Sequence, residues 1–172
     1  MILTEHPVVD AILARHAEDL GESAPVYRGH VLRGLNYQAL LLDEQVPDSA
    51  ALAWAVHDIG IYTAGTFDYL PPSVGLVREL AGDFGIADVA LAEEMVAEHH
   101  GLRARGNPLV ATFRRADLVD ASRGLVRSGL TRAQVREVVA AVPYAGFHRQ
   151  IYGGLLAHAV RHPLRPFPML KL

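Results

Sequence analysis

The sequence predicts an all-α protein, folded as a single-domain bundle of about seven to eight helices over residues 1–172. Apolar residues recur at helical spacing along most of the chain. Helix-start and helix-stop residues divide it at short intervals, and no segment alternates apolar and polar residues as a half-buried strand does. With 51% hydrophobic and 20% charged residues among 172, the chain has enough apolar side chains for one sizeable core.

The first hundred residues predict five helices. Pro25 suits the first turn of the second helix. Asp48 or Ser49 is expected to cap the third helix, and Gly60 to end it. After it, a glycine and a double proline predict an ordered loop over residues 61–72. The five expected helices cover about 8–20, 25–42, 48–60, 73–83 and 87–100.

Three more helices are expected in the second half. Asn107 followed by Pro108 is a good cap and first-turn pair for a helix that ends near residue 124. Thr131 and Gln134 have the spacing of a capping box. A last helix over about 145–162 is expected to stop at Pro163, with the apolar, proline-rich tail lying extended against the body.

Bulk charge and composition exclude several classes of partner. The net charge is −3, so no nucleic-acid polymer and no anionic membrane surface is expected as a partner. The absence of cysteine rules out disulfides and thiol chemistry. The longest apolar run, residues 50–56, is too short to span a bilayer. The N-terminal residues lack the pattern of a secretory signal, and a cytoplasmic location is expected.

The dipeptide His57–Asp58 follows that apolar run directly, in "WAVHDIGIY". Both side chains should therefore be nearly buried, and a buried carboxylate needs a cation or several hydrogen-bond donors. Adjacent helical side chains point about 100° apart, so both reach one centre only near a helix end. A metal ion satisfies this geometry. A structural His–Asp pair is the alternative.

The order of polar residues along the chain extends this pair. His30 precedes it in "YRGHVLRGLNYQALLL", and Asp117 follows it in "FRRADLVDAS". In these residues the chain resembles the HD-domain superfamily of metal-dependent phosphohydrolases, whose pattern is a His, an adjacent His-Asp and a distant Asp on a helical bundle. The resemblance is strongest over residues 25–125. It implies that His30, His57, Asp58 and Asp117 bind a metal ion.

A set of two imidazoles and two carboxylates would suit one divalent ion, Mn, Fe, Co, Ni, Mg or Zn. The resemblance implies a hydrolase that uses metal-activated water on a small phosphoester or nucleotide, with a small, anionic molecule as substrate. Ile61 stands where some relatives carry Lys or Glu, and this departure weakens an assignment to the nucleotidases or the cyclic-dinucleotide enzymes.

Residues around the predicted metal site are candidates for further roles. Asp68, in the irregular loop, is the candidate acid or base, and a turn or capping role is its alternative. His99 and His100 end a predicted helix. His100 is expected to face inward as a catalytic residue, and His99 to contact substrate. One metal is expected, since relatives with two need histidines at two separate places.

Two arginines lie one turn from a predicted ligand. Arg33 follows His30 and Arg114 precedes Asp117 by three residues, so each could bind a substrate anion. The alternative for each is an ion pair with a carboxylate behind the ligands. Asp120 either accepts a hydrogen bond from a metal-binding residue or faces solvent.

Other functions remain open at this point. The loop "FDYLPP" resembles that of bacterial HD proteins of the cyanamide-hydratase type, which implies hydration of a small C–N substrate. An HD-type iron oxygenase and a non-catalytic ligand-binding module are further alternatives. Apolar residues of the tail, Leu164, Phe167 and Met169, would allow a homodimer contact.

Overall fold

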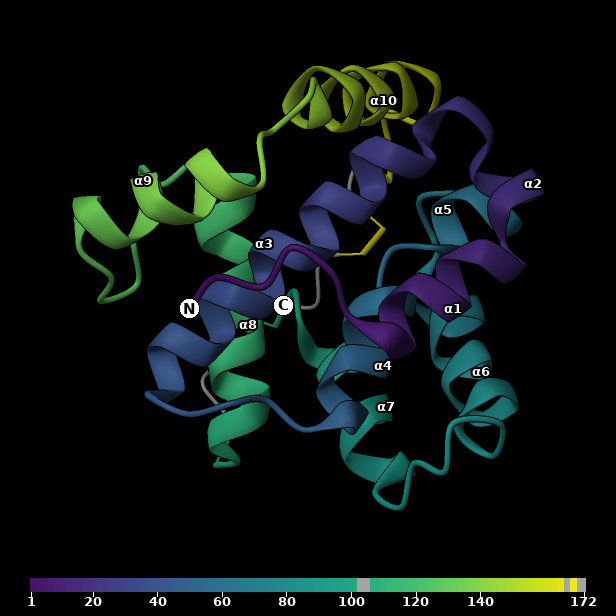
Figure 1. Cartoon of the computed structure of the whole chain (residues 1–172). Helices are drawn as coiled ribbons and strands as arrows, with labels where there is room; N and C mark the ends of the chain where they lie inside the picture. The colour runs from purple at the N-terminus through teal and green to yellow at the C-terminus, as the bar shows by residue number, and fades with distance from the viewer. Residues whose placement is uncertain (102–105, 166–167, 170–172) are drawn as a thin grey trace.

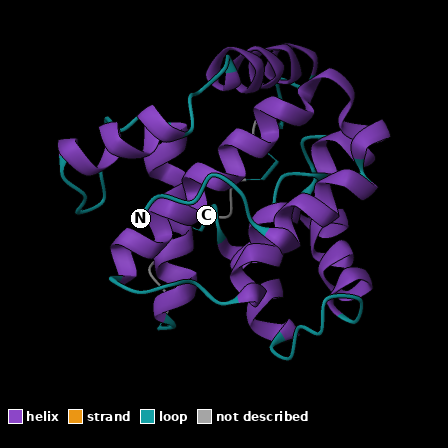
Figure 2. Cartoon of the chain, viewed as in Figure 1, coloured by secondary structure: helices purple, strands orange, loops and turns teal. Residues whose placement is uncertain are grey.

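A computed structural model describes residues 1–101, 106–165 and 168–169, and within them it confirms the all-α prediction (Figures 1 and 2). Within these residues, eight helices have nine or more residues, and three one-turn elements join them. The long helices are α1 (Pro7–Arg15), α3 (Ala24–Leu42), α4 (Asp48–Val56), α6 (Leu70–Ala81), α7 (Val89–Glu98), α8 (Pro108–Ala121), α9 (Arg132–Ala141) and α10 (Phe147–Arg161). The short ones are α2 (Ala17–Leu20), the 3-10 helix η1 (Gly21–Ser23) and α5 (Gly60–Thr63).

Helix α3 is the central helix of the bundle. It packs against α8, α4, α1, α9 and α10, and Figure 1 shows it running diagonally between them. Every residue from Gly29 to Gln38 is buried, as expected of a helix surrounded on all sides. Polar residues on this helix, including His30 and Arg33, therefore need partners inside the protein.

Helix α4 carries the densest part of the core. Residues 49–60 are all buried, and the Trp54 ring stacks on Phe113 of α8 with centroids 4.1 Å apart. Its indole N–H donates to the side-chain oxygen of Gln38 at 2.7 Å, so the polar end of the ring is also satisfied. Gly34 lets this ring lie directly on the backbone of α3, because a Cβ there would be 2.2 Å from the indole.

Gly34→Ala is expected to destabilise the protein by about 1–3 kcal/mol, since the added methyl group must displace a fully buried indole. Gly75→Ala is the matched control. Gly75 also lies within a helix, but a Cβ there meets no heavy atom within 4 Å, so this change should stabilise by about 0.5–1 kcal/mol. Urea unfolding measures both variants. Equal effects of the two changes would refute the close-packing argument.

Helix boundaries depart from the predictions mainly where caps and prolines were ambiguous. Pro47 is the cap position of α4, and neither Asp48 nor Ser49 caps it. Helix α6 begins at Leu70, inside the expected loop, because the double proline falls in its first turn, where a missing N–H costs nothing. The predictions at α8 and α9 are confirmed: Asn107 caps α8, and the Thr131–Gln134 capping box begins α9.

The C-terminal segment lies partly against the body. Met169 is buried with Tyr69 and Leu70, so it is not available for the predicted dimer contact. Leu164 is fully exposed, and Phe167 lies outside the described residues. None of the helices in the described ranges combines the length and apolarity that a membrane crossing requires.

Candidate metal centre

The four residues of the predicted ligand set converge in the core. His30 comes from α3, His57 and Asp58 from the turn after α4, and Asp117 from α8. The Nε2 atoms of His30 and His57 are 3.0 Å apart. His30 Nε2 lies 3.8 Å from Asp58 Oδ2 and 3.5 Å from Asp117 Oδ1. His57 Nε2 lies 3.5 Å and 3.9 Å from the same two oxygens.

The end of α4 fixes the orientation of His57. Val56 is the last residue of the helix, and His57 occupies the C-cap position. Its Nδ1 atom lies 2.9 Å from the carbonyl oxygen of Trp54, one of the last carbonyls of the helix, which have no partner within it. A carbonyl oxygen can only accept, so Nδ1 carries the proton and Nε2 presents its lone pair.

His99 repeats this local geometry at the end of α7. It is the C-cap residue of that helix, and its Nδ1 atom lies 2.7 Å from the carbonyl oxygen of Val96. Its Nε2 atom lies 3.4 Å from Asp58 Oδ1. His99 therefore joins the cluster as a third imidazole, with its lone pair directed at a ligand carboxylate.

A buried carboxylate orients the remaining imidazole. Asp120 Oδ2 accepts from His30 Nδ1 at 2.7 Å, which leaves Nε2 of His30 facing His57. Phe147 of α10 stacks on the His30 ring, with centroids 4.3 Å apart. Metal-binding histidines commonly donate their second ring nitrogen to a carboxylate or a carbonyl in this way.

The arrangement requires a cation. The Nε2 atoms of His30 and His57 lie beside the carboxylates of Asp58 and Asp117, and His99 Nε2 lies beside Asp58. The Asp58 Oδ1 atom is buried without a hydrogen-bond partner. Either a proton or a metal ion must lie between these atoms, because lone pairs and anions repel. Ligands at about 2.1 Å from an ion are about 3.0–3.4 Å apart, close to the separations seen here.

Among the residues that the structure describes, two overlapping groups of donor atoms are close enough together to hold a metal ion. One consists of His30, His57 and Asp58, and the other of Asp58, His99 and His100. Asp58 belongs to both, and Asp117 contacts the first. Either group could hold a metal ion.

Burial and charge set the protonation of the cluster. Burial lowers the pKa of His57 to about 3 and raises the pKa of Asp117 to about 6. Burial alone would lower the pKa values of His30 and His99, but neighbouring carboxylates, chiefly Asp120 and Asp58 respectively, raise both. Burial also opposes ionisation of Asp58, yet the surrounding imidazoles hold its pKa well below its usual range.

Metal affinity is expected to fall as the pH is lowered from 8 to 6, because a metal ion must displace protons from its ligands. The pKa of Asp117 is raised to about 6, and the pKa values of His30 and His99 are raised above their ordinary value, so these groups bind more protons at pH 6 than at pH 8. Each proton released changes the affinity by up to about tenfold per pH unit. Calorimetric titration with Mn²⁺ in buffers of different ionisation enthalpy measures the effect; an affinity independent of pH would contradict it.

Arg33 does not have its predicted substrate-binding role. The side chain is fully buried, and it donates to both oxygens of Asp120, at 2.6 and 2.9 Å. A third donor reaches the Pro143 carbonyl oxygen at 2.9 Å. The guanidinium therefore forms an ion pair with Asp120, which was the alternative for Arg33. Asp120 in turn accepts a hydrogen bond from His30, the first of its two predicted roles.

The order of the two neighbouring histidines is the reverse of the prediction. His99 is buried and faces Asp58, whereas His100 is only partly buried. His100 Nε2 lies 2.6 Å from the hydroxyl of Tyr69, whose oxygen is also 3.4 Å from His99 Nε2. The periodicity of a helix could not decide between the two, because α7 ends before either residue.

The sequence predictions name Asp68 but not its neighbour Tyr69, whose hydroxyl lies beside His99 and His100. Asp68 is exposed, and its carboxylate pairs with Arg165 at 3.6 Å, so the structure does not bring the predicted acid or base into the cluster. Gly60 allows the backbone of Tyr69 to approach, since a Cβ would be 2.6 Å from the Tyr69 carbonyl oxygen. A glycine two residues after Asp58 was the feature of the sequence that could have indicated a close backbone approach at this turn.

Arg114 does not pair with a ligand carboxylate in the described structure. It is partly exposed and donates to the carbonyl oxygen of Gly101 at 3.2 Å, next to His100. It therefore lies beside the cluster and not in it.

No model of a known protein family matches the chain, and neither the curated proteins nor the solved structures contain a match.

Proposed function

We propose that this protein is a metal-dependent hydrolase of the HD type, acting on a small phosphoester. The convergence of His30, His57, Asp58 and Asp117, with nitrogen and oxygen atoms 3.0–3.9 Å apart, is the observation that supports it. These residues lie in the order His, His-Asp, Asp that the HD resemblance requires. They would hold one divalent ion, which would supply a water of lowered pKa and polarise a phosphoryl oxygen.

Exposure indicates the side from which substrate would approach. The imidazoles of His30 and His57 are 1% and 0% exposed, whereas Asp58 and Asp117 retain 8% and 7%. Access is therefore from the carboxylate side of the cluster. A small, anionic molecule fits such a site better than a polymer, since the ligands lie below the surface.

Tyr69 and His100 are the nearest candidates for handling a proton beside the ligands. Burial and the nearby carboxylates raise the pKa of Tyr69 well above its usual value, so its hydroxyl stays protonated. Burial lowers the pKa of His100 to about 3, so this imidazole is neutral and accepts the hydroxyl proton in a hydrogen bond. The pair could instead donate to a leaving-group oxygen.

A second candidate function is oxidation by a two-iron centre. The observation that favours it is the second donor group, Asp58 with His99 and His100, which shares one carboxylate with the first group. The sequence predicts one metal, since relatives with two need histidines at two separate places and no histidine lies between residues 59 and 98. Yet His99 and His100 provide two imidazoles beside a shared carboxylate.

The deciding experiment combines metal analysis with turnover. The purified chain, loaded in turn with Mn²⁺, Fe²⁺, Co²⁺, Ni²⁺, Mg²⁺ and Zn²⁺, is assayed on p-nitrophenyl phosphate and nucleoside monophosphates. Hydrolysis that a chelator stops and Asp58→Ala abolishes would support the proposal. His16→Ala is the control, since His16 pairs with Asp19 at the surface. A metal-bound protein that turns over no phosphoester would refute the proposal, and two irons with the absorption of a coupled pair would favour the second candidate.

A further inference from the structure

A cavity of about 560 Å³ lies between the loop that follows α5 and the second half of α10. This volume is within the range of small-molecule sites. Its lining includes Gly65, Asp68, Gly154, His158, Arg161, His162 and Arg165. The metal cluster contributes none of them, so the cavity is a separate feature of the molecule.

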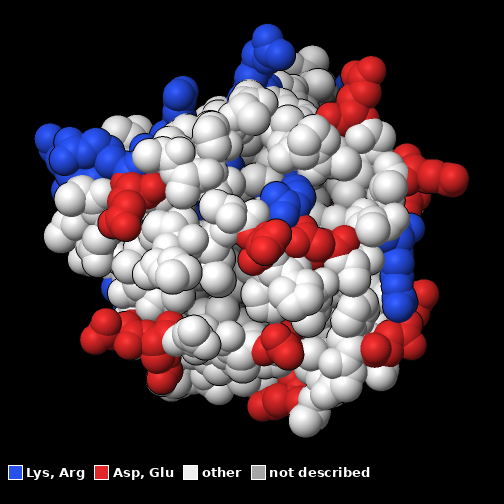
Figure 3. Space-filling view, viewed as in Figure 1, with Lys and Arg blue, Asp and Glu red and all other residues white. Residues whose placement is uncertain are grey.

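The walls of the cavity are rich in cationic and hydrogen-bonding side chains. The lining includes two arginines, Arg161 and Arg165, and one carboxylate, that of Asp68. The sequence from residue 138 to its end contains four basic residues and no Asp or Glu, although the whole chain has a net charge of −3. On the face seen in Figure 3, Lys and Arg gather over α9 and single ones lie over α10, while acidic side chains are spread over the rest of the face and also stand beside both helices.

Several of these groups have unused hydrogen-bonding capacity. The ion pair between Arg165 and Asp68 is long, at 3.6 Å, and both side chains remain exposed, by 73% and 47%. Nε2 of His158 is buried without a hydrogen-bond partner, and its ring lies beside that of His162, with centroids 4.5 Å apart. An incoming anion could therefore be bound without breaking a strong contact.

We propose that this cavity binds a small phosphate ester, with Arg161 and Arg165 as the principal contacts to the phosphate. Arginine presents several donors in a fork that matches phosphate oxygens. The spacing of His158 and His162 would also suit a metal ion, but two neighbouring arginines oppose a cation there. The dipole at the end of α10 favours basic residues in its last turn, yet it accounts neither for Arg165, beyond the helix, nor for the cavity.

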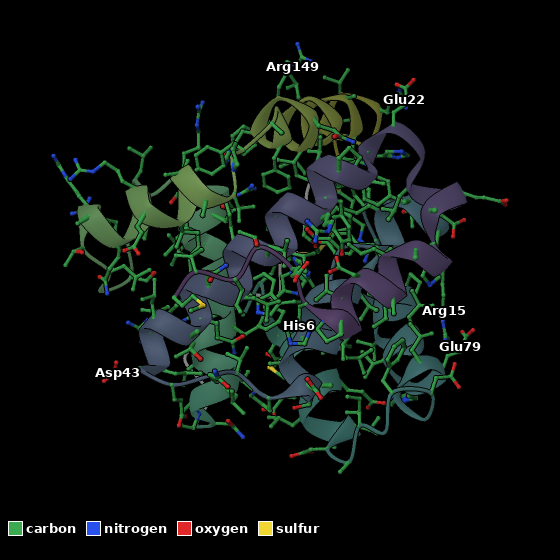
Figure 4. The ribbon with its side chains drawn as sticks, viewed as in Figure 1. His6, Arg15, Glu22, Asp43, Glu79 and Arg149 are labelled. Carbon is green, nitrogen blue, oxygen red and sulfur yellow. The ribbon has the colours of Figure 1, made fainter. Side chains whose placement is uncertain are left out.

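The proposal does not depend on the proposed function, because it places binding outside the metal cluster. Calorimetric titration of the full chain with inorganic phosphate and with phenyl phosphate, in chelator, tests it. The double variant Arg161→Gln/Arg165→Gln is expected to weaken binding roughly tenfold or more, as the loss of charged hydrogen bonds implies. The control is Arg149→Gln on the same helix, whose side chain points away from the body (Figure 4) and should leave binding unchanged.

His57→Ala distinguishes the two sites, since it should leave phosphate binding intact. If that variant does not fold, the amide shifts of Gly65 and Gly154 in the wild-type protein locate the ligand instead. Three results would overturn the proposal: no binding of either probe, equal weakening by Arg149→Gln and the double variant, or amide shifts confined to the metal cluster.

Discussion

His57→Ala is expected to lower the affinity for a divalent metal ion by more than about 100-fold. Substitution of a residue that only hydrogen-bonds to a metal ligand lowers the affinity by up to about that factor. The imidazole is fully buried between Trp54 and the two carboxylates. Its low pKa, about 3, makes it the ligand that needs no deprotonation. Its loss removes one imidazole from beside the carboxylates of Asp58 and Asp117.

The effect can be measured as metal-dependent stability. Saturation at one hundred times the dissociation constant should stabilise the wild-type protein by about 2.7 kcal/mol, and a mutant that binds no metal should gain nothing. His16→Ala should behave as the wild type. Metal stabilisation retained by His57→Ala would exclude this residue as a ligand. Stabilisation lost in both variants would point to a general loss of folding and not to a site.

The convergence of the four predicted ligand residues could be expected because it depends on sequence order and helix ends. An apolar run followed by His-Asp forces both side chains into the interior at the point where α4 ends. His30 and Asp117 lie on α3 and α8, which pack extensively on each other. Hydrophobic periodicity thus predicted the helices and the burial of His57 and Asp58, whereas His30 and Asp117 were identified through the HD resemblance.

The groups around the ligands were predicted less well, because their roles depend on tertiary partners. An arginine one turn from a predicted ligand could either bind substrate or form a buried ion pair with a carboxylate. For Arg33, the position of Asp120 shows that it forms the ion pair. The same holds for Tyr69 and Asp68: both follow an irregular segment, and the approach of Tyr69 to Gly60 determines which one turns inward. Helix-end residues are also outside helical periodicity, which is why the order of His99 and His100 was wrong.

The ion pair of Arg33 and Asp120 links the stability of the bundle to the orientation of the centre. Both side chains are 0% exposed. Asp120 accepts from His30 and from the guanidinium simultaneously, and its pKa is lowered by these two partners although burial opposes ionisation. The Arg33 guanidinium also lies over the Tyr144 ring, 4.7 Å from its centroid. One arginine thus joins α3, α8 and the segment before α10.

Arg33→Met is therefore expected to lower the free energy of unfolding by about 3–5 kcal/mol, the cost of leaving one member of a buried pair without its partner. Urea unfolding of the protein, with and without metal, measures it. Arg28→Met is the matched control on the same helix: its partner Asp10 is 35% exposed, and such a pair contributes less than about 1 kcal/mol.

The double variant Arg33→Met/Asp120→Asn separates the buried charge from lost packing. Asparagine removes the negative charge and can still accept from His30 Nδ1 through its carbonyl oxygen. If the unpaired carboxylate causes the loss, the double variant will be less destabilised than the sum of the two single changes, by about 1–3 kcal/mol. Strict additivity would mean that the arginine stabilises the fold by filling space and by its contact with Tyr144. In that case Asp120 would hold His30 in place without the help of Arg33, and Arg33→Met would leave the affinity for Mn²⁺ unchanged.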